Sequence, residues 1–159
     1  YCDLDNFKAY NDHRGFVQGD RLIQTTARII QDAVLEFSGP EGFVGHVGGD
    51  DFVAVVDPDA ADKAAKRIVE RFDSGIADFY EREDIERGFV EVIDRRGEQQ
   101  RTPLASISIG VAMTGKRRFN HYVEAVNVAT EMKQYAKRRS GSSFAIDRRA
   151  ETGEPPETG

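Results

Sequence analysis

The sequence predicts an α+β fold in which a central, mainly antiparallel sheet has helices on both faces. Apolar residues recur at helical spacing over residues 19–37 and 60–80. Short apolar runs flank a Gly-Gly turn within residues 43–56, and apolar and polar residues alternate at 89–93 and 104–109, as expected of strands. The 159 residues are enough for one domain with a sizeable core.

The first half of the chain is expected to form a strand, two helices and a hairpin. The first strand ends near Leu4, and a short helix covers residues 7–11. A long helix follows over residues 19–37 until Ser38-Gly39-Pro40 stops it. Its apolar face is formed by Leu22, Ile23, Ile30, Ala33, Val34 and Phe37. The hairpin within residues 43–56 comes next.

The second half is expected to begin with the helix over residues 60–80 and to continue with the strands at 89–93 and 104–109. The polar residues 94–101 would join these two strands as a hairpin loop. A last helix covers residues 122–139, and residues 143–146 form a final edge strand.

Two segments are interpreted differently. The charged residues 80–87 are expected to be a solvated loop, with a subfamily-specific surface as the alternative. One domain is expected over residues 1–147, and the polar residues 148–159 are expected to be a disordered tail.

Composition restricts the class of protein. The net charge of −6 and the pI near 5.1 argue against non-specific nucleic-acid binding, which depends on basic surface. No apolar stretch is long enough to span a membrane, and no signal-peptide pattern is present. The single Cys2 cannot form an internal disulfide, so a cytoplasmic location is expected. Two basic runs, 116–118 and 137–139, are interpreted mainly as solvated surface.

The segment Gly48-Gly49-Asp50-Asp51-Phe52 is the most informative part of the sequence. The two glycines remove the Cβ atoms that would keep a ligand away from the backbone. Two adjacent carboxylates repel each other unless a cation lies between them, and Mg²⁺ is usually bound together with phosphate. Taken alone, a solvated hairpin turn explains the segment equally well.

A second acidic cluster near the N-terminus favours the metal-binding interpretation. Asp3 at the first strand and Asp51 at the hairpin are the paired acids that would hold Mg²⁺ against a triphosphate. Lys8 suits a point-charge contact to phosphate. Asn11 and Asp20 can together recognise a purine edge, because a carboxylate accepts from guanine N1–H and its N2 amine but finds no such donor pair on adenine. Each residue alone also has an ordinary turn or helix-start explanation.

Four motifs in this order resemble the GGDEF family of diguanylate cyclases. They are Asp3-x-Asp5-x-Phe7-Lys8-x-x-Asn11-Asp12, then Gly19-Asp20, then Gly48-Gly49-Asp50-Asp51-Phe52, then Ser106-Ile107-Ser108-Ile109-Gly110-Val111. The resemblance extends from the first residues to about Lys137. It implies the ferredoxin-related, palm-like fold of nucleotidyl cyclases and polymerases, with both acidic clusters side by side.

The resemblance also implies roles for individual residues. Asp3, the backbone carbonyl of Leu4 and Asp51 would ligate Mg²⁺ or Mn²⁺, and Asp50 would help deprotonate the attacking 3′-hydroxyl or bind a second metal. The remaining contacts would all be to GTP. Gly48 and Gly49 would admit the ribose and α-phosphate, the amides of Asn6 and Phe7 with Lys8 and Lys137 would hold phosphates, and Asn11 and Asp20 would bind guanine.

In the family, two GTP-loaded domains meet face to face, so a homodimer would be needed to make cyclic di-GMP. Because the chain starts within the first strand, it is expected to be part of a larger signalling protein with an upstream sensory or output domain. It is similar to GGDEF domains at the end of proteins that contain an EAL domain with a CBS pair, or a receiver. No nucleic-acid or membrane partner is expected.

The sequence departs from the family pattern at several positions. Asp51 replaces the usual glutamate, His46 stands where arginine is common, and Thr130 replaces an aspartate. The product-inhibition motif Arg-x-x-Asp is absent at residues 39–42. Three hypotheses therefore remain, namely an active cyclase, a GTP-binding regulatory domain without turnover, and a structural module that binds no nucleotide.

Overall fold

The computed structural model describes residues 1–93, 97–115 and 117–149. Among these residues the longer helices are α1 (Phe7–Arg14), α2 (Phe16–Ser38), α3 (Ala61–Gly75) and α5 (Tyr122–Ala136), with a short helix α4 (Arg82–Arg87). The strands are β1 (Cys2–Asp5), β2 (Phe43–Gly48), β3 (Asp51–Val55), β4 (Phe89–Ile93), β5 (Gln99–Pro103), β6 (Ser106–Val111) and β7 (Ser143–Ile146).

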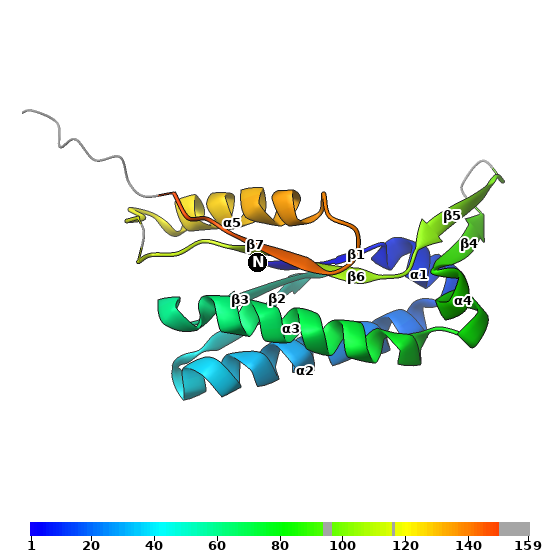
Figure 1. The fold of residues 1–159 in the computed structure, drawn as a ribbon, viewed down its shortest axis with the longest axis horizontal. Coiled ribbons are helices and arrows are strands. Elements are labelled where there is room, and N and C mark those ends of the chain that lie inside the picture. The colour runs from blue at the N-terminus through cyan, green and yellow to red at the C-terminus, as the bar shows by residue number, and fades with distance from the viewer. Residues whose placement is uncertain (94–96, 116, 150–159) are drawn as a thin grey trace, which may run out of the picture.

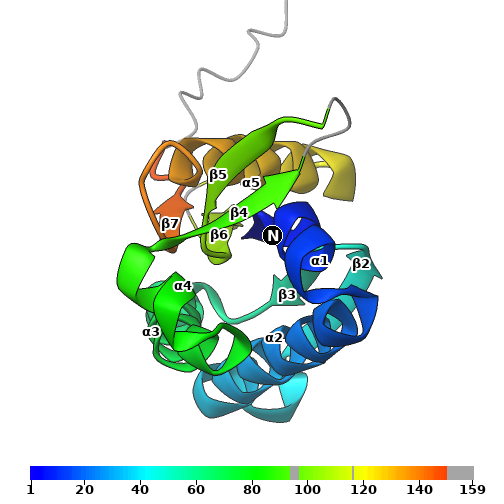
Figure 2. The ribbon, with the colours of Figure 1, turned by 90° about the vertical axis from the view of Figure 1, so that its right-hand side faces the viewer.

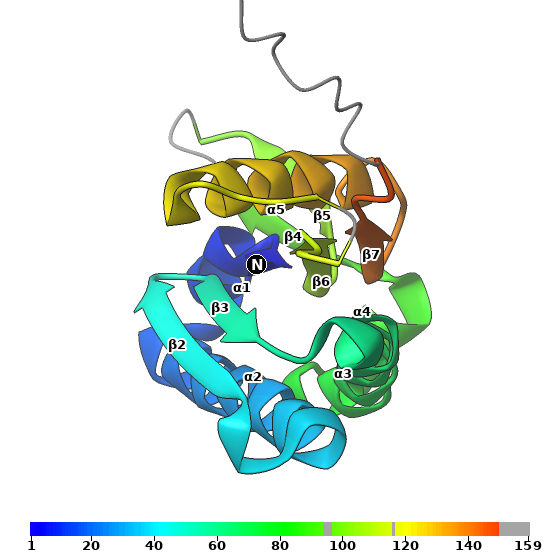
Figure 3. The same cartoon turned by 90° about the vertical axis from the view of Figure 1, so that its left-hand side faces the viewer.

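Five strands form a central sheet in the order β2-β3-β1-β6-β7. All neighbours are antiparallel except β6 and β7, which are parallel. Helices α2 and α3 pack on one face and α5 on the other (Figures 1 and 3). The prediction of a mainly antiparallel sheet with helices on both faces is therefore confirmed, as is the edge strand at residues 143–146.

The core lies where α2 and α3 meet the central strands. Its largest fully buried side chains include Leu4 of β1, Phe52 of β3 and Ile107 of β6. Burying each such side chain contributes about 1.5–3 kcal/mol. The central strands β1 and β3 are fixed by this burial, and the acidic residues of both strands are fixed with them.

The contact between α5 and β6 depends on a glycine. A Cβ atom on Gly110 would lie 1.9 Å from the carbonyl oxygen of Ala129 and 2.3 Å from the backbone nitrogen of Lys133. Both atoms belong to the backbone of α5, so neither can rotate away. Gly110 therefore allows α5 to approach β6 closely and sets the position of Lys133.

We expect Gly110→Ala to lower the free energy of unfolding by about 1–3 kcal/mol, because the added methyl group forces α5 away from the sheet. Urea unfolding followed by circular dichroism measures this change. Gly75→Ala is the matched control, since nothing lies within 4 Å of its Cβ position and its backbone is helical. That control should be neutral or slightly stabilising, and an equally neutral Gly110→Ala would contradict the close approach.

Helix boundaries differ from the prediction in several places. The first helix extends to Arg14, and the second begins already at Phe16, because Gly15 with φ of +83° separates them. Of the helix expected over residues 60–80, only α3 is α-helical. A 3-10 turn at Pro58–Ala60 precedes α3, and another at Ile76–Phe79 follows it. The last helix ends at Ala136 instead of residue 139.

Two predictions about the polar segments were wrong. The strand at 89–93 does not form a hairpin with the strand predicted at 104–109, because Gln99–Pro103 is itself a strand that pairs with β4 in a separate two-stranded sheet. Its side chains are mostly exposed, so the segment shows no apolar alternation. Residues 94–96 of the predicted loop lie outside the described residues. The expected loop at residues 80–87 contains α4, which packs near β4 (Figure 2).

Helix α4 is held by a buried carboxylate. Asp84 accepts from Arg87 at 2.6 Å, and His13 Nε2 of α1 lies 3.0 Å from it. Burial alone would raise the pKa of Asp84, but the hydrogen bonds with His13 and Arg87 outweigh burial and hold this pKa below its ordinary value. Because Asp84 of α4 contacts His13 of α1, α4 is anchored to the rest of the domain.

The tail expected over residues 148–159 falls, apart from Arg148 and Arg149, outside the described residues.

Candidate functional site

Two aspartates lie opposite each other at one end of the central sheet. Asp3 of β1 and Asp51 of β3 are register partners in the antiparallel ladder. Asp5 lies two residues after Asp3 and therefore points to the same face of β1. Asp3 is buried, and Asp5 and Asp51 are half-buried. The pairing of β1 with β3 thus brings Asp51 close to Asp3 and Asp5, which precede it in the sequence by 46 positions or more.

Two lysines from α5 and its C-terminal end neutralise this cluster. Lys133 Nζ lies 2.8 Å from Asp3 Oδ1 and 2.9 Å from Asp51 Oδ1. Lys137 Nζ lies 2.5 Å from Asp3 Oδ2 and 3.2 Å from Asp5 Oδ1. The second oxygen of Asp5 accepts from the hydroxyl groups of Ser108 and Ser106, its neighbours on β6. We call these three carboxylates and two ammonium groups the acid–lysine cluster.

The pKa shifts of Asp3, Lys133 and Lys137 all favour the charged forms. Burial acts against the charge of Asp3, but the contacts with Lys133 and Lys137 are stronger and hold its pKa below the ordinary value. Burial likewise disfavours the charged form of the two lysines, yet their contacts with carboxylates raise the pKa of both. Lys133 contacts Asp3 and Asp51, and Lys137 contacts Asp3 and Asp5. Asp3, Lys133 and Lys137 are therefore ionised at neutral pH.

The Gly-Gly turn lies beside this cluster at the tip of the β2–β3 hairpin. Gly48 and Gly49 have φ of +142° and +58°, and nothing lies within 4 Å of either Cβ position. The carbonyl of Asp50 accepts a hydrogen bond from the Leu4 amide at 3.1 Å, which ties the turn to β1. His46 stacks on Phe52, with ring centroids 4.8 Å apart, and its Nε2 lies 3.0 Å from the Gly49 carbonyl oxygen. The turn thus leaves space next to Gly48 and Gly49, and the contacts of His46 with Phe52 and Gly49 support it.

The start of α1 follows β1 at the same end of the sheet. Asn6 has φ of +61°, the one described non-glycine residue with a positive φ, and its side chain donates to the Leu104 carbonyl. The amides in the first turn of a helix lack intrahelical acceptors and favour anions. The amides of Asn6 and Phe7 are therefore suited to bind phosphate oxygens, and their contact with phosphate stays a prediction. Lys8 is exposed and pairs with Asp12 at 2.7 Å, so it is not part of the acid–lysine cluster.

Helices α1 and α2 meet at Gly19. A Cβ atom there would lie 1.8 Å from Asn11 Oδ1 and 3.3 Å from the Phe7 ring. Asn11 Oδ1 is buried and has no hydrogen-bond partner among the described residues. The neighbouring Asp20 is exposed on α2. An unpartnered buried acceptor beside an exposed carboxylate suits a ligand edge that presents N–H groups.

Lys133 is the site residue that the sequence analysis missed. A lysine on a helix is normally exposed, whereas Lys133 is buried against two acids from distant strands. Its spacing of four residues from Lys137 places both lysines on one helical face, and this spacing was the available signal. Arg117 of the other basic run pairs with Asp147 at 3.4 Å, while Lys116 lies outside the described residues.

The carboxylate and carbonyl oxygens of this site are of the type that binds divalent cations. Asp3 Oδ2 is buried without a well-directed hydrogen bond among the described residues, although Lys137 Nζ is close to it. The described residues contain no cluster of three acidic, His or Cys side chains arranged around a metal position. The protein would therefore supply two carboxylates and the Leu4 carbonyl, and phosphate or water oxygens would complete the shell, as is usual for Mg²⁺.

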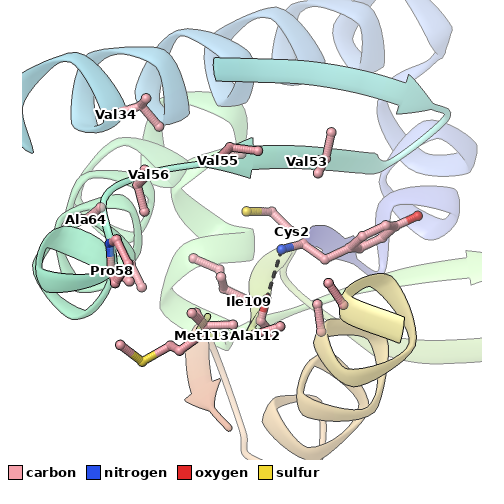
Figure 4. A pocket seen from close by; sticks show the side chains of 18 of the residues that line it. Cys2, Val34, Val53, Val55, Val56, Pro58, Ala64, Ile109, Ala112 and Met113 are labelled. Carbon is pink, nitrogen blue, oxygen red and sulfur yellow. Dashed lines mark hydrogen bonds between the residues drawn. The ribbon is translucent and has the colours of Figure 1, made fainter. Parts of the chain in front are cut away.

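A separate hollow does not contain the predicted site. It has a volume of about 420 Å³ and lies between the sheet, α3 and α5. Figure 4 shows the apolar side chains that line it, among them Cys2, Val53 and Ile109. None of the predicted metal, phosphate or base contacts lines it. In the described part of the chain, no helix has both the length and the apolar character needed to cross a bilayer.

The chain is similar to known proteins of one family. A family model described as "Diguanylate cyclase, GGDEF domain" matches residues 1–143. The "Cyclic di-GMP phosphodiesterase PdeB" of Shewanella oneidensis is 39% identical over 56 residues, which are 35% of this chain and 6% of that protein. A "Diguanylate cyclase" of Vibrio cholerae is 33% identical over 73 residues, which are 44% of this chain and 22% of that protein. The chain thus spans a small part of these curated relatives.

A solved structure agrees with the fold. The active GGEEF domain of a diguanylate cyclase from Vibrio cholerae has a TM-score of 0.63 to this chain at 21% sequence identity. The match covers 94% of this chain and 81% of that chain.

Proposed function

Because this chain belongs to the GGDEF family of diguanylate cyclase domains, we propose that it binds GTP and condenses two GTP molecules into cyclic di-GMP and two pyrophosphates. The observation that supports the proposal most is the register of Asp3 with Asp51. It places a pair of carboxylates beside the turn with Asp50 and beside the first turn of α1. In this proposal, the metal ligands, the proton acceptor and the anion-binding amides therefore lie at one end of the sheet.

Each part of GTP has a matching group in this proposal. The amides of Asn6 and Phe7 hold the terminal phosphates, together with the ammonium groups of Lys8 and Lys137. Asn11 Oδ1 and the Asp20 carboxylate accept from the N–H groups on the guanine edge. The open turn at Gly48 and Gly49 admits the ribose and α-phosphate. Asp3, Asp51 and the Leu4 carbonyl would hold Mg²⁺ or Mn²⁺, which neutralises phosphate charge when bound.

The chemistry is a pair of phosphoryl transfers. The 3′-oxygen of one nucleotide forms a bond to the α-phosphorus of the other, and the bond from that phosphorus to the bridging oxygen of pyrophosphate breaks. Asp50, half-buried at the tip of the hairpin, accepts the proton of the 3′-hydroxyl. The second transfer repeats this with the roles of the nucleotides exchanged and closes the ring. The main contribution of the protein is positioning.

Two nucleotides must meet, so the proposal requires two copies of the domain facing each other. We propose that further domains of a longer protein bring the copies together, since the matched regions are only 6% and 22% of the two curated relatives described above. A GTP-binding regulatory domain without turnover is the second candidate. Two observations favour it, the shorter Asp51 side chain and the Lys133 ammonium between Asp3 and Asp51.

Guanine recognition tests the binding part of the proposal. We expect the protein to bind GTP at least about ten-fold more tightly than ATP, because Asp20 pairs with donors that adenine lacks. Asp20→Asn should remove most of this preference, whereas Asp32→Asn, on the same helix but near Arg71, should not. Competition titrations with a fluorescent GTP analogue measure both effects. Equal affinity of the wild type for GTP and ATP would contradict the proposed base contact.

A further inference from the structure

The Lys133 ammonium occupies the position between the two facing carboxylates. Its distances to Asp3 Oδ1 and Asp51 Oδ1 are nearly equal, at 2.8 and 2.9 Å. The lysine side chain is 8% exposed, and its Nζ also lies 4.6 Å from the centre of the Tyr1 ring. Such a placement gives the ammonium two charge-assisted hydrogen bonds and an aromatic neighbour.

The close packing of α5 on β6 keeps the backbone of Lys133 in place, so the ammonium cannot move away by a shift of the helix. Gly110 of β6 lies so close to α5 that an added Cβ would be 2.3 Å from the Lys133 backbone nitrogen. The lysine backbone is therefore held against the sheet next to β1. Only a change of side-chain rotamer can move the ammonium away from the two acids.

A divalent cation at the same place would compete with this ammonium. Mg²⁺ needs oxygen ligands at about 2.0–2.1 Å, and Asp3 Oδ1 and Asp51 Oδ1 are already engaged by Lys133. A cation beside a retained ammonium would also be repelled in a largely buried setting, where screening is weak. Lys137 next to Asp3 adds to this repulsion.

We propose that Lys133 is a resident counter-ion that fills the cation position between Asp3 and Asp51, so that a divalent metal binds there only by displacing it. The nucleotide-free domain would then have its acids neutralised without metal. The affinity of the site for a divalent metal would then depend on Lys133 as much as on Asp3 and Asp51. The inference concerns the site of the proposed function, but its test uses no nucleotide, so that each proposal can fail separately.

The test is Mn²⁺ binding, followed by the electron paramagnetic resonance signal of free Mn²⁺. We expect Lys133→Met to bind Mn²⁺ at least about ten-fold more tightly than the wild type, because the competing charge is gone and the acids remain. Lys66→Met is the matched control. It removes a lysine of α3 that is 66% exposed, on the opposite face of the sheet, and should leave Mn²⁺ affinity unchanged. Adding Asp3→Asn to Lys133→Met should abolish the gain.

A second variant and a second readout cover the case in which Lys133→Met does not fold. Lys133→Gln removes the charge but keeps a polar group for the carboxylates, and it should show the same gain. Mn²⁺ should also raise the melting temperature of the lysine variants more than that of the wild type. Equal or weaker Mn²⁺ binding by the folded variants, or no binding by any of the proteins, would overturn the proposal.

Discussion

Replacing Asp3 by Asn is expected to lower the free energy of unfolding by about 3 kcal/mol, because the change leaves buried lysine charge without its main partner. Asp3 contacts both Lys133 and Lys137, and after the substitution only Asp51 and Asp5 remain as their acidic partners. Urea unfolding at pH 7 measures the loss. Asp12→Asn is the control, since its ion pair with Lys8 is exposed and should be worth less than about 1 kcal/mol.

The same pair of proteins has a defined pH dependence. The pKa of Asp3 is below its ordinary value of 3.8 in the folded state. Its contribution to stability is therefore fully present above pH 3.8 and is lost as the pH falls through the lower folded-state pKa. The stability difference between the wild type and Asp3→Asn should shrink over that acidic range. A difference below about 1 kcal/mol already at pH 7 would contradict the pairing energy assumed here.

Asp50→Ala is expected to reduce cyclic di-GMP formation by at least about 100-fold while leaving folding and GTP binding nearly unchanged. Asp50 lies on an open turn whose backbone is tied to Leu4, and its carboxylate is not needed for that contact. Its loss should therefore affect proton transfer and not the framework. Initial rates at saturating GTP, with thermal unfolding as a check on folding, measure the effect.

A matched control for this prediction lies just beyond the other end of the same strand. Asp59 is an exposed acid in the 3-10 turn after β3, and Asp59→Ala should keep the wild-type rate. If Asp50→Ala retained a rate within about three-fold of the wild type, the proton would have to go to another acceptor.

Local patterns made much of this fold predictable. The Gly-Gly hairpin, the long helix α2 and the strand β7 depend on residues near in sequence, and all were expected before the structure. The strand β5 and the helix α4 were not, because one is polar and exposed and the other is six residues long. Helix α4 is held by a contact with His13, which is 71 positions from Asp84, and no local pattern reports such a contact.

The site shows the same division between local and distant information. The family pattern named both acids, but their register depends on the pairing of strands 48 positions apart. Lys133 was missed because lysine is rarely buried, and it becomes buried only where two carboxylates meet it. Lys137, for which the family pattern predicts a phosphate contact, is paired with Asp3 and Asp5 in the structure. The roles of the individual site residues remain predictions.

The most direct test of cyclase activity is the product that the domain makes from GTP. The domain would be fused to a dimeric coiled coil, so that two copies can meet, and incubated with GTP and a range of Mg²⁺ or Mn²⁺ concentrations before mass spectrometry. We expect cyclic di-GMP and pyrophosphate in a ratio of one to two, and no cyclic product from the fused Asp50→Ala variant. GTP that is bound by the fused wild type but never converted, at any metal concentration, would contradict the cyclase assignment and favour a regulatory GTP-binding domain.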